Sequence, residues 1–320
     1  MVASAAYFLL STIELNSAQW PAGYRNYSLF VGHPMLTSEQ VDKVHHDIPN
    51  SKVLAYYCSS WVYLGKGCSL DRYEMKDYFN ASLAITNLDT GEPACVTFGP
   101  SGGIAGYVFS RASADAIATY HREVTLRGAS WDGIYLDELD DAFPSRWKGT
   151  IANQTSNFDI NGDGVADSFD ELDAQYAAWR PYYTQVMRAA VGPDRLLIGN
   201  GGAPATADPA LNGRTIEFES CCQGTHGTAC PSSEVAPGLA ICRSTLAGQA
   251  AVSVQPPVSV MWHTHEYVLP AAVQCEEMRH VREQMPWVLE GDDREDGSWH
   301  SSCGGNATFQ SEHANRRPTK

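Results

Sequence analysis

The sequence of 320 residues predicts an α/β fold, a (β/α)8 TIM barrel with a long loop after strand 3 and a calcium-binding loop after strand 4. Two observations lead to this fold. Short apolar runs recur along the chain, and helical patterns separate several of them. The runs are apolar on both faces, which is typical of a parallel sheet covered by helices on both sides. Seven runs qualify as strands, over residues 7–10, 28–32, 52–57, 133–137, 196–199, 215–219 and 258–262.

Helical patterns fill gaps between the runs. Thr37 and Gln40 form a capping-box pattern in front of apolar residues at helical spacing. A longer helix is predicted after the fourth run, from the apolar positions Leu172, Tyr176, Trp179, Tyr183 and Met187. Strand and helix therefore alternate, and an eighth strand near Trp287 or Trp299 would complete a barrel.

An open doubly wound sheet is the alternative to a barrel. Such sheets hold nucleotide phosphates with a glycine-rich loop after an early strand. Neither G-x-G-x-x-G nor G-x-x-x-x-G-K-[ST] follows an early run here. We therefore expect one barrel over residues 1–300 and a C-terminal tail over 301–320. The connection 64–106 is long and rich in Gly, Tyr, Cys and Pro, which indicates a functional loop or a small subdomain.

The charge balance limits the classes of partner. Lys and Arg number 22 against 37 Asp and Glu, so the net charge is −15. A chain with this charge repels polyanions at long range, and we expect neither nucleic acid nor an anionic membrane as a partner. No segment approaches the roughly 18–20 uninterrupted apolar residues of a spanning helix, which excludes an integral membrane protein. The expected state is a monomer.

The cysteines indicate an oxidising compartment. The chain has 9 of them, clustered locally and without a C-x-x-C pair, which favours disulfides over a structural zinc site. We expect a disulfide between Cys58 and Cys68, and at least one more within Cys221, Cys222, Cys230 and Cys242. Secretion is the expected localisation, in agreement with glycosylation sequons at Asn26, Asn80, Asn153 and Asn306.

The sharpest local motif lies between residues 159 and 170. Gly164 at its sixth position permits the sharp turn that wraps a loop around a hard cation. Oxygen ligands fall at the spacing of a calcium loop, from Asp159, Asn161, Asp163, the carbonyl of Val165, Asp167 and Asp170. The sequence therefore predicts bound Ca²⁺ that braces the loop after the fourth strand. An acidic surface turn with an Asp helix cap is the alternative.

Two strand ends carry carboxylates on one face. Side chains alternate along a strand, so Asp137 shares a face with Tyr135 and lies at the C-terminal end. By the same alternation, Glu219 ends the sixth run on the face of Glu217. Barrel active sites are built at this end of the strands. Two carboxylates there can cleave a glycosidic bond, one as nucleophile or base and the other as an acid.

Six motifs occur in order along the chain: YFLL, YSLFVG, NSKVLAYY, WDGIYLDEL, LLIGNGG and IEFES. This order resembles the TIM-barrel hypothetical glycoside hydrolases related to the endo-α-1,4-polygalactosaminidases, over residues 7–285, most specifically in D-G-I-Y-L-D at 132–137. The resemblance implies a sugar-active barrel. In the retaining clan that includes the α-galactosidases, the nucleophile ends strand four and the acid/base ends strand six. The resemblance thus implies Asp137 as nucleophile and Glu219 as acid/base of a retaining enzyme.

Other side chains near strand ends are candidate sugar contacts. Aromatic rings can stack on the apolar faces of sugars, and polar groups can bind hydroxyls. The candidates are Tyr56, Trp61, Glu138, Asn200, Glu217, Trp262 and His263. The expected partner is a carbohydrate substrate, an oligosaccharide or a polysaccharide.

Two other functions compete with glycoside hydrolysis. A barrel of this fold could bind carbohydrate without cleaving it. Alternatively, His263 and His265 point the same way along a strand, as metal-ligating pairs do in metal-dependent hydrolases.

Overall fold

The structure is a computed structural model. It describes residues 5–25, 27–33, 36–64, 75–98, 102–106, 108–128, 130–143, 148, 151, 157–202, 205–217, 235–254, 260–263 and 289–292.

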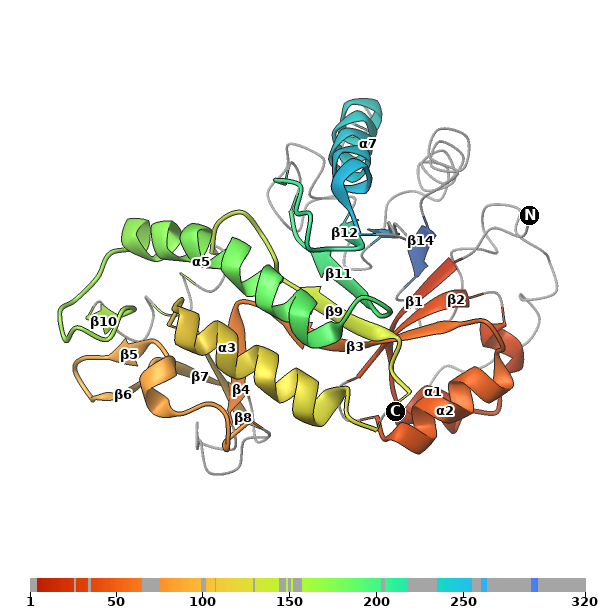
Figure 1. The fold of residues 1–320 in the computed structure, drawn as a ribbon, viewed down its shortest axis with the longest axis horizontal. Helices are drawn as coiled ribbons and strands as arrows, with labels where there is room; N and C mark the ends of the chain where they lie inside the picture. Colours follow the sequence, from red (N-terminus) through yellow and green to blue (C-terminus); the bar gives the residue numbers. More distant parts are fainter. Residues whose placement is uncertain are drawn as a thin grey trace, which may run out of the picture.

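Eight parallel strands form the centre of the molecule (Figure 1). They are β1 (Ala5–Leu10), β2 (Tyr27–Gly32), β3 (Lys52–Cys58), β9 (Gly133–Asp137), β11 (Leu196–Asn200), β12 (Gly213–Glu217), β13 (Val260–His263) and β14 (Leu289–Asp292). Their order is β1-β14-β13-β12-β11-β9-β3-β2, and β1 pairs with both β14 and β2, so the strand order closes on itself. The predicted α/β class and parallel sheet are confirmed.

Side-chain alternation divides the core of the strands into two parts. One face of β2, β3, β9 and β11 forms an inner cluster of Leu29, Val31, Leu54, Tyr135, Leu196 and Ile198, with Tyr56 packed against it. The opposite faces pack against the helices in a larger outer cluster, which includes Phe30, Val53, Ile134 and Leu197. Asp137 shares the parity of Tyr135, and Asn200 that of Ile198, so both end strands on the inner side.

The helices cover the strands from outside (Figure 1). They are α1 (Thr12–Leu15), α2 (Ser38–Asp47), α3 (Arg111–Tyr120), α5 (Phe169–Val191) and α7 (Val235–Val252), with short η1 (Ala22–Tyr24) and η4 (Ala81–Leu83) and the π-helix η5 (His121–Thr125). The predicted capping box is present: the Thr37 hydroxyl accepts the Gln40 N–H, and the Gln40 side chain accepts the Thr37 N–H. In Figure 1, α3 and α5 lie side by side.

The predicted eightfold alternation is only partly shown. Between β11 and β12, the described residues 201–202 and 205–212 contain no helix. This segment instead contacts the loop after β9, as set out below. Among the helices that the structure describes, none has the length and hydropathy needed to cross a bilayer.

Both long loops of the barrel fold into small sheets. The connection after β3 forms β4 (Trp61–Leu64), β7 (Cys95–Phe98) and β8 (Gly102–Gly106) in the order β4-β8-β7. It also supplies β5 (Thr86–Asn87) and β6 (Glu92–Pro93), which join β10 (Phe158–Asp159) from the loop after β9. The connection 64–106 is expected to be a functional loop or a small subdomain, and its small sheets favour the subdomain, to which the loop after β9 contributes a strand.

The N-terminal end of β9 anchors the strand to its neighbours. The Asp132 carboxylate contacts Lys52 Nζ at 2.6 Å and His45 Nε2 at 2.8 Å, and it accepts the Val53 N–H at 2.8 Å. Gly133 follows, and a Cβ there would lie 1.8 Å from the Leu196 carbonyl oxygen of β11. The close approach of these two strands therefore requires glycine at position 133.

Candidate active site

The Asp137 carboxylate ends β9 inside the ring of strands, and three neutral groups hold it. Tyr56 donates its hydroxyl to Oδ2 at 2.7 Å, and Asn200 donates Nδ2–H to Oδ1 at 2.8 Å. The backbone N–H of Glu138 donates to Oδ1 at 2.9 Å. Hydrogen bonds to an ionised carboxylate are strong, and they fix its orientation. The ends of β3, β9 and β11 thus meet at one oriented carboxylate.

A chain of hydroxyl groups sets the orientation of the Asn200 amide. Thr215 on β12 donates its hydroxyl to Asn200 Oδ1 at 2.8 Å. Because that proton is used, the Tyr135 hydroxyl, 2.9 Å from Thr215 Oγ1, is the donor in its bond with Thr215. Asn200 Oδ1 therefore acts as an acceptor, and Nδ2 must face Asp137.

Tyr56 remains a donor at all ordinary pH values. Burial, followed by the negative charge of Asp137, raises the pKa of the Tyr56 hydroxyl well above its usual value. Its ring stacks on Tyr135, with centroids 6.2 Å apart and planes inclined by 22°. Sequence reasoning placed Tyr56 and Asn200 near the substrate, and the structure shows both bonded to Asp137.

The chain turns sharply at Glu138, the residue that follows Asp137. The φ of 55° at Glu138 lies in the left-handed region, which costs a non-glycine residue about 1–3 kcal/mol. The side chain is buried, and its Oε2 accepts hydrogen bonds from the Ser60 hydroxyl and, at 3.2 Å, from the Cys58 thiol. The backbone carbonyl accepts the Tyr176 hydroxyl at 2.8 Å. Contacts from β3 and α5 thus stabilise the left-handed backbone conformation at this position.

The predicted disulfide between Cys58 and Cys68 is wrong, because Cys58 is free and buried. Cys58 is the last residue of β3 and has the inward parity of Tyr56, so its thiol reaches Glu138. Burial, together with the nearby charge of Asp137, raises the pKa of this thiol above its usual range. Cys68 lies outside the described residues. Cys95 and Cys242 each take part in a disulfide bond.

The structure describes only some of the other predicted site residues. Trp61 is half-buried at the start of β4. Glu217 ends β12, where it pairs in register with Trp262 of β13, and His263 ends β13 opposite Asp292. Glu219 and His265 lie outside the described residues, so the second carboxylate and the histidine pair stay predictions.

The predicted calcium loop begins at Asp159, the last residue of β10. Both oxygens of the buried Asp159 carboxylate accept backbone N–H groups, from Asn161, Gly162 and Gly164. The Asp167 carboxylate accepts the Ile160 N–H at 2.7 Å. Asp163, Val165 and Asp170 are exposed. Within the part of the chain that is described, no three His, Cys, Asp or Glu side chains gather closely enough to hold a metal ion. Calcium binding therefore stays a prediction.

Sequence reasoning missed several residues of this site. Thr215 shares the strand parity of Glu217, so the alternation that placed Tyr135 on the face of Asp137 could have found Thr215 as well. Ser60 and Cys58 could not be found in this way, because their contact with Glu138 depends on its left-handed backbone.

Comparison with known proteins gives structural matches only. No family model and no curated protein sequence matches the chain. The cycloalternan-degrading enzyme from Trueperella pyogenes is similar, with a TM-score of 0.56 and 9% identity over 95% of this chain and 46% of that chain. The same enzyme in complex with a covalent intermediate has a TM-score of 0.54 and 8% identity, over 94% and 44% of the two chains.

A third similar structure is a mutant of Kfla1895 in complex with cyclobis-(1→6)-α-nigerosyl, with a TM-score of 0.51 and 10% identity over 95% and 45% of the chains. The chain spans less than half the length of these proteins. At such low identity the likeness shows a shared fold.

Proposed function

We propose that the chain is a glycoside hydrolase that cleaves an α-linked oligosaccharide or polysaccharide at the C-terminal ends of the barrel strands. The observation that carries this proposal is the Asp137 carboxylate, which donors from three strand ends hold in one orientation. The similar solved structures support it, since one is a cycloalternan-degrading enzyme and another is in complex with a nigerosyl sugar. The covalent intermediate in one of them favours a retaining mechanism.

In the proposed mechanism, Asp137 is the nucleophile. One of its carboxylate oxygens attacks the anomeric carbon, the bond from that carbon to the glycosidic oxygen breaks, and the leaving oxygen receives a proton from Glu219. Glu219, now ionised, then removes a proton from water, whose oxygen attacks the anomeric carbon and releases Asp137. Asn200 and Tyr56 orient Asp137, because each donates to a different carboxylate oxygen.

The neutral character of these donors supports a nucleophilic role. A phenol, an amide and a backbone N–H orient the carboxylate without cancelling its charge. The charge therefore remains available to stabilise a developing oxocarbenium ion or to form a bond with it.

The decisive experiment combines product analysis with trapping. We expect the protein to release sugar from at least one member of a panel containing isomaltose, α-glucan polysaccharides and the p-nitrophenyl α-glycosides of glucose and galactose. Proton NMR of the first product should show the α-anomer. A 5-fluoro-α-glycosyl fluoride of the cleaved sugar should label the peptide that contains Asp137.

Each other outcome favours a different function. Binding to a polysaccharide without any turnover would indicate a carbohydrate-binding barrel. Turnover that chelators abolish and zinc restores would favour the metal-dependent hydrolase that uses His263 and His265. A β-anomer as first product would replace the retaining mechanism by an inverting one.

Bound Ca²⁺ in the loop 159–170 is part of the proposal. Burial raises the pKa of Asp167, and so do the negative charges of Asp159, Glu171 and Asp163, against the opposing Ile160 N–H bond. A cation would offset this repulsion. The side chains as they stand do not converge on one point, so binding would require their rotation. Secretion, which is also proposed, would expose the loop to millimolar calcium.

A further inference from the structure

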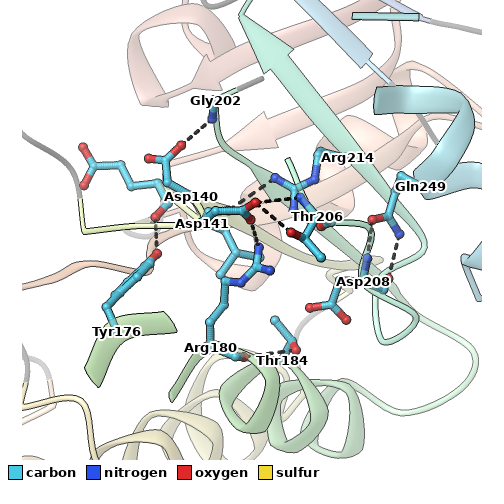
Figure 2. Close-up of polar contacts among 12 residues, drawn as sticks. Asp140, Asp141, Tyr176, Arg180, Thr184, Gly202, Thr206, Asp208, Arg214 and Gln249 are labelled. Carbon is cyan, nitrogen blue, oxygen red and sulfur yellow. Dashed lines mark hydrogen bonds and ion pairs between the residues drawn. The ribbon is translucent and has the colours of Figure 1, made fainter. Parts of the chain in front are cut away.

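The loops that follow β9 and β11 are joined residue by residue (Figure 2). Leu139 donates its N–H to the Asn200 carbonyl at 2.5 Å, and the Asp140 carboxylate accepts the Gly202 N–H. Asp141 Oδ2 accepts both the N–H and the hydroxyl of Thr206, each at 2.8 Å. These contacts begin two residues after Asp137 and at Asn200. They therefore connect the backbone that carries Asp137 to the backbone that carries Asn200.

Arg214 lies across this junction. It stands on β12 with outward parity, its side chain is fully buried, and it reaches both loops. Nη1 donates to the Leu139 carbonyl at 3.3 Å, and Nη2 donates to the Thr206 carbonyl at 3.2 Å. One guanidinium thus bridges the two loops, and its planar fork suits two acceptors at a fixed spacing.

A second arginine completes the junction from outside. Arg180 of α5 pairs with Asp141 Oδ1 at 2.7 Å, while the other oxygen of Asp141 holds Thr206 (Figure 2). Burying Arg214 next to Arg180 is costly: desolvation, followed by the charge of Arg180, lowers the pKa of Arg214. Replacing buried charges by apolar residues is often neutral for stability, which agrees with a role of these arginines in fixing the geometry of the junction.

We propose that Arg214 is a positioning residue for the Asp137–Asn200 pair, because it locks the loop after β9 to the loop after β11. The proposal rests on the proposed function and deepens it. Without the guanidinium, the carbonyls of Leu139 and Thr206 lose their common donor, and only the direct hydrogen bonds between the two loops hold them together. The Asn200 amide then moves relative to Asp137, and the carboxylate loses one of its orienting donors.

Arg188 offers a matched control at the other end of the strands. It lies on α5 and donates to the carbonyls of Ala210, Gly192 and Arg195 and to Asn212 Oδ1. These acceptors lie before the starts of β11 and β12 or at the loop that enters β12. Arg188 therefore donates to four acceptors, against the two that Arg214 bridges, and lies at the far end of the strands from Asp137.

The test compares Arg214→Met, Arg214→Lys and Arg188→Met in the full chain. We expect Arg214→Met to accelerate amide exchange at Leu139, Gly202 and Thr206 at least about tenfold. The Asn200 side-chain NH₂ signal, assigned with Asn200→Ser, should shift toward its non-hydrogen-bonded position. Arg188→Met should lower the melting temperature and leave both signals unchanged. Arg214→Lys should recover part of the protection.

Activity supplies a second readout. On the p-nitrophenyl α-glycoside that the wild type cleaves, Arg214→Met should lower kcat about tenfold and change KM less than twofold, whereas Arg188→Met should change neither. Equal losses of kcat in the two methionine variants, or an unmoved Asn200 signal in Arg214→Met, would overturn the positioning role. If the wild type cleaves none of the glycosides, the proposed function fails. The positioning role of Arg214 is then tested by the Asn200 NH₂ signal and the amide exchange rates alone.

Discussion

The two ends of β9 each carry an aspartate, and their surroundings differ in kind. At the N-terminal end, Asp132 contacts the ammonium group of Lys52 and the ring of His45. At the C-terminal end, Asp137 is bonded to a phenol, an amide and a backbone N–H. The first carboxylate is compensated by charge and serves to join strands, as expected at the bottom of a barrel. The second is oriented by neutral donors, as a reacting carboxylate requires.

The largest expected effect separates these two aspartates directly. Asp137→Asn should lower kcat at least about 10³-fold, as loss of a reacting group does, with little change in the free energy of unfolding. Asp132→Asn should lower that free energy by about 1–3 kcal/mol and leave kcat unchanged. Steady-state kinetics and urea denaturation of both variants check this. Similar kcat losses in both would contradict the contrast between the two ends.

The glycine next to Asp132 gives a test of packing at the same end. Gly133→Ala would place a methyl group 1.8 Å from the Leu196 carbonyl oxygen, a backbone atom that cannot rotate away. We expect a loss of more than about 3 kcal/mol in the free energy of unfolding, or no folded protein.

Gly248 on α7 is the matched control, because a methyl group at this position would have no atom within 4 Å. Gly248→Ala should stabilise the protein by up to about 1 kcal/mol, since alanine favours the helix. Thermal unfolding and circular dichroism report both results. A well-folded Gly133→Ala protein of unchanged stability would show that β9 and β11 can move apart.

The free energy of unfolding should depend on pH through a buried histidine that lies outside β9. His121 in η5 is buried against Tyr57, with ring centroids 4.4 Å apart, and burial lowers its pKa from 6.5 to about 3. Above pH 6.5 the ring is neutral in both the folded and unfolded states. As the pH falls from 6.5 toward 3, the unfolded chain binds a proton that the folded chain does not. Stability should fall by up to about 1.4 kcal/mol per pH unit.

Urea denaturation between pH 7.5 and 4 measures this slope. His121→Gln removes the titrating ring, so its stability should vary less steeply with pH over the same interval. Identical slopes in the wild type and the variant would remove His121 from the explanation.

A further effect on stability is expected in the loop that begins at the end of β10. Asp159→Ala removes the acceptor of three backbone N–H groups and should lower the free energy of unfolding by about 1–3 kcal/mol, with or without calcium. If Ca²⁺ binds, millimolar calcium should raise the melting temperature of the wild type, and a chelator should reverse the change. Asp159→Ala should not respond. No calcium-dependent shift in the wild type would contradict the predicted metal site.

Sequence alternation and periodicity predicted most of the barrel, because its strands are apolar on both faces and bounded by turns. The seven predicted runs correspond to β1, β2, β3, β9, β11, β12 and β13, and β14 begins two residues after Trp287. Strand parity likewise placed Asp137 on the face of Tyr135, at the C-terminal end of its strand. These properties depend on neighbours within one strand.

Other parts depend on contacts between distant segments, and local patterns carry no information about them. The thiol of Cys58 turns inward to Glu138, so the nearby Cys68 was a misleading partner. Asp140 and Asp141 follow Asp137 in the sequence, but their hydrogen bonds to the loop after β11 could be found only in the folded structure. Asp137 at the end of β9 and the two aspartates that follow it thus have different roles, because one is the candidate nucleophile and the other two bind the neighbouring loop.

The pairing of β5 with β10 limits how this barrel can be altered. Thr86 and Asn87 come from the connection after β3, and their partners Asp159 and Phe158 come from the loop after β9. Each loop therefore supplies the other with backbone hydrogen bonds. Exchanging one of them for the corresponding loop of another barrel would leave an unpaired strand edge in the protein. Grafting this part of the molecule, by recombination or by design, requires that both loops be transferred together.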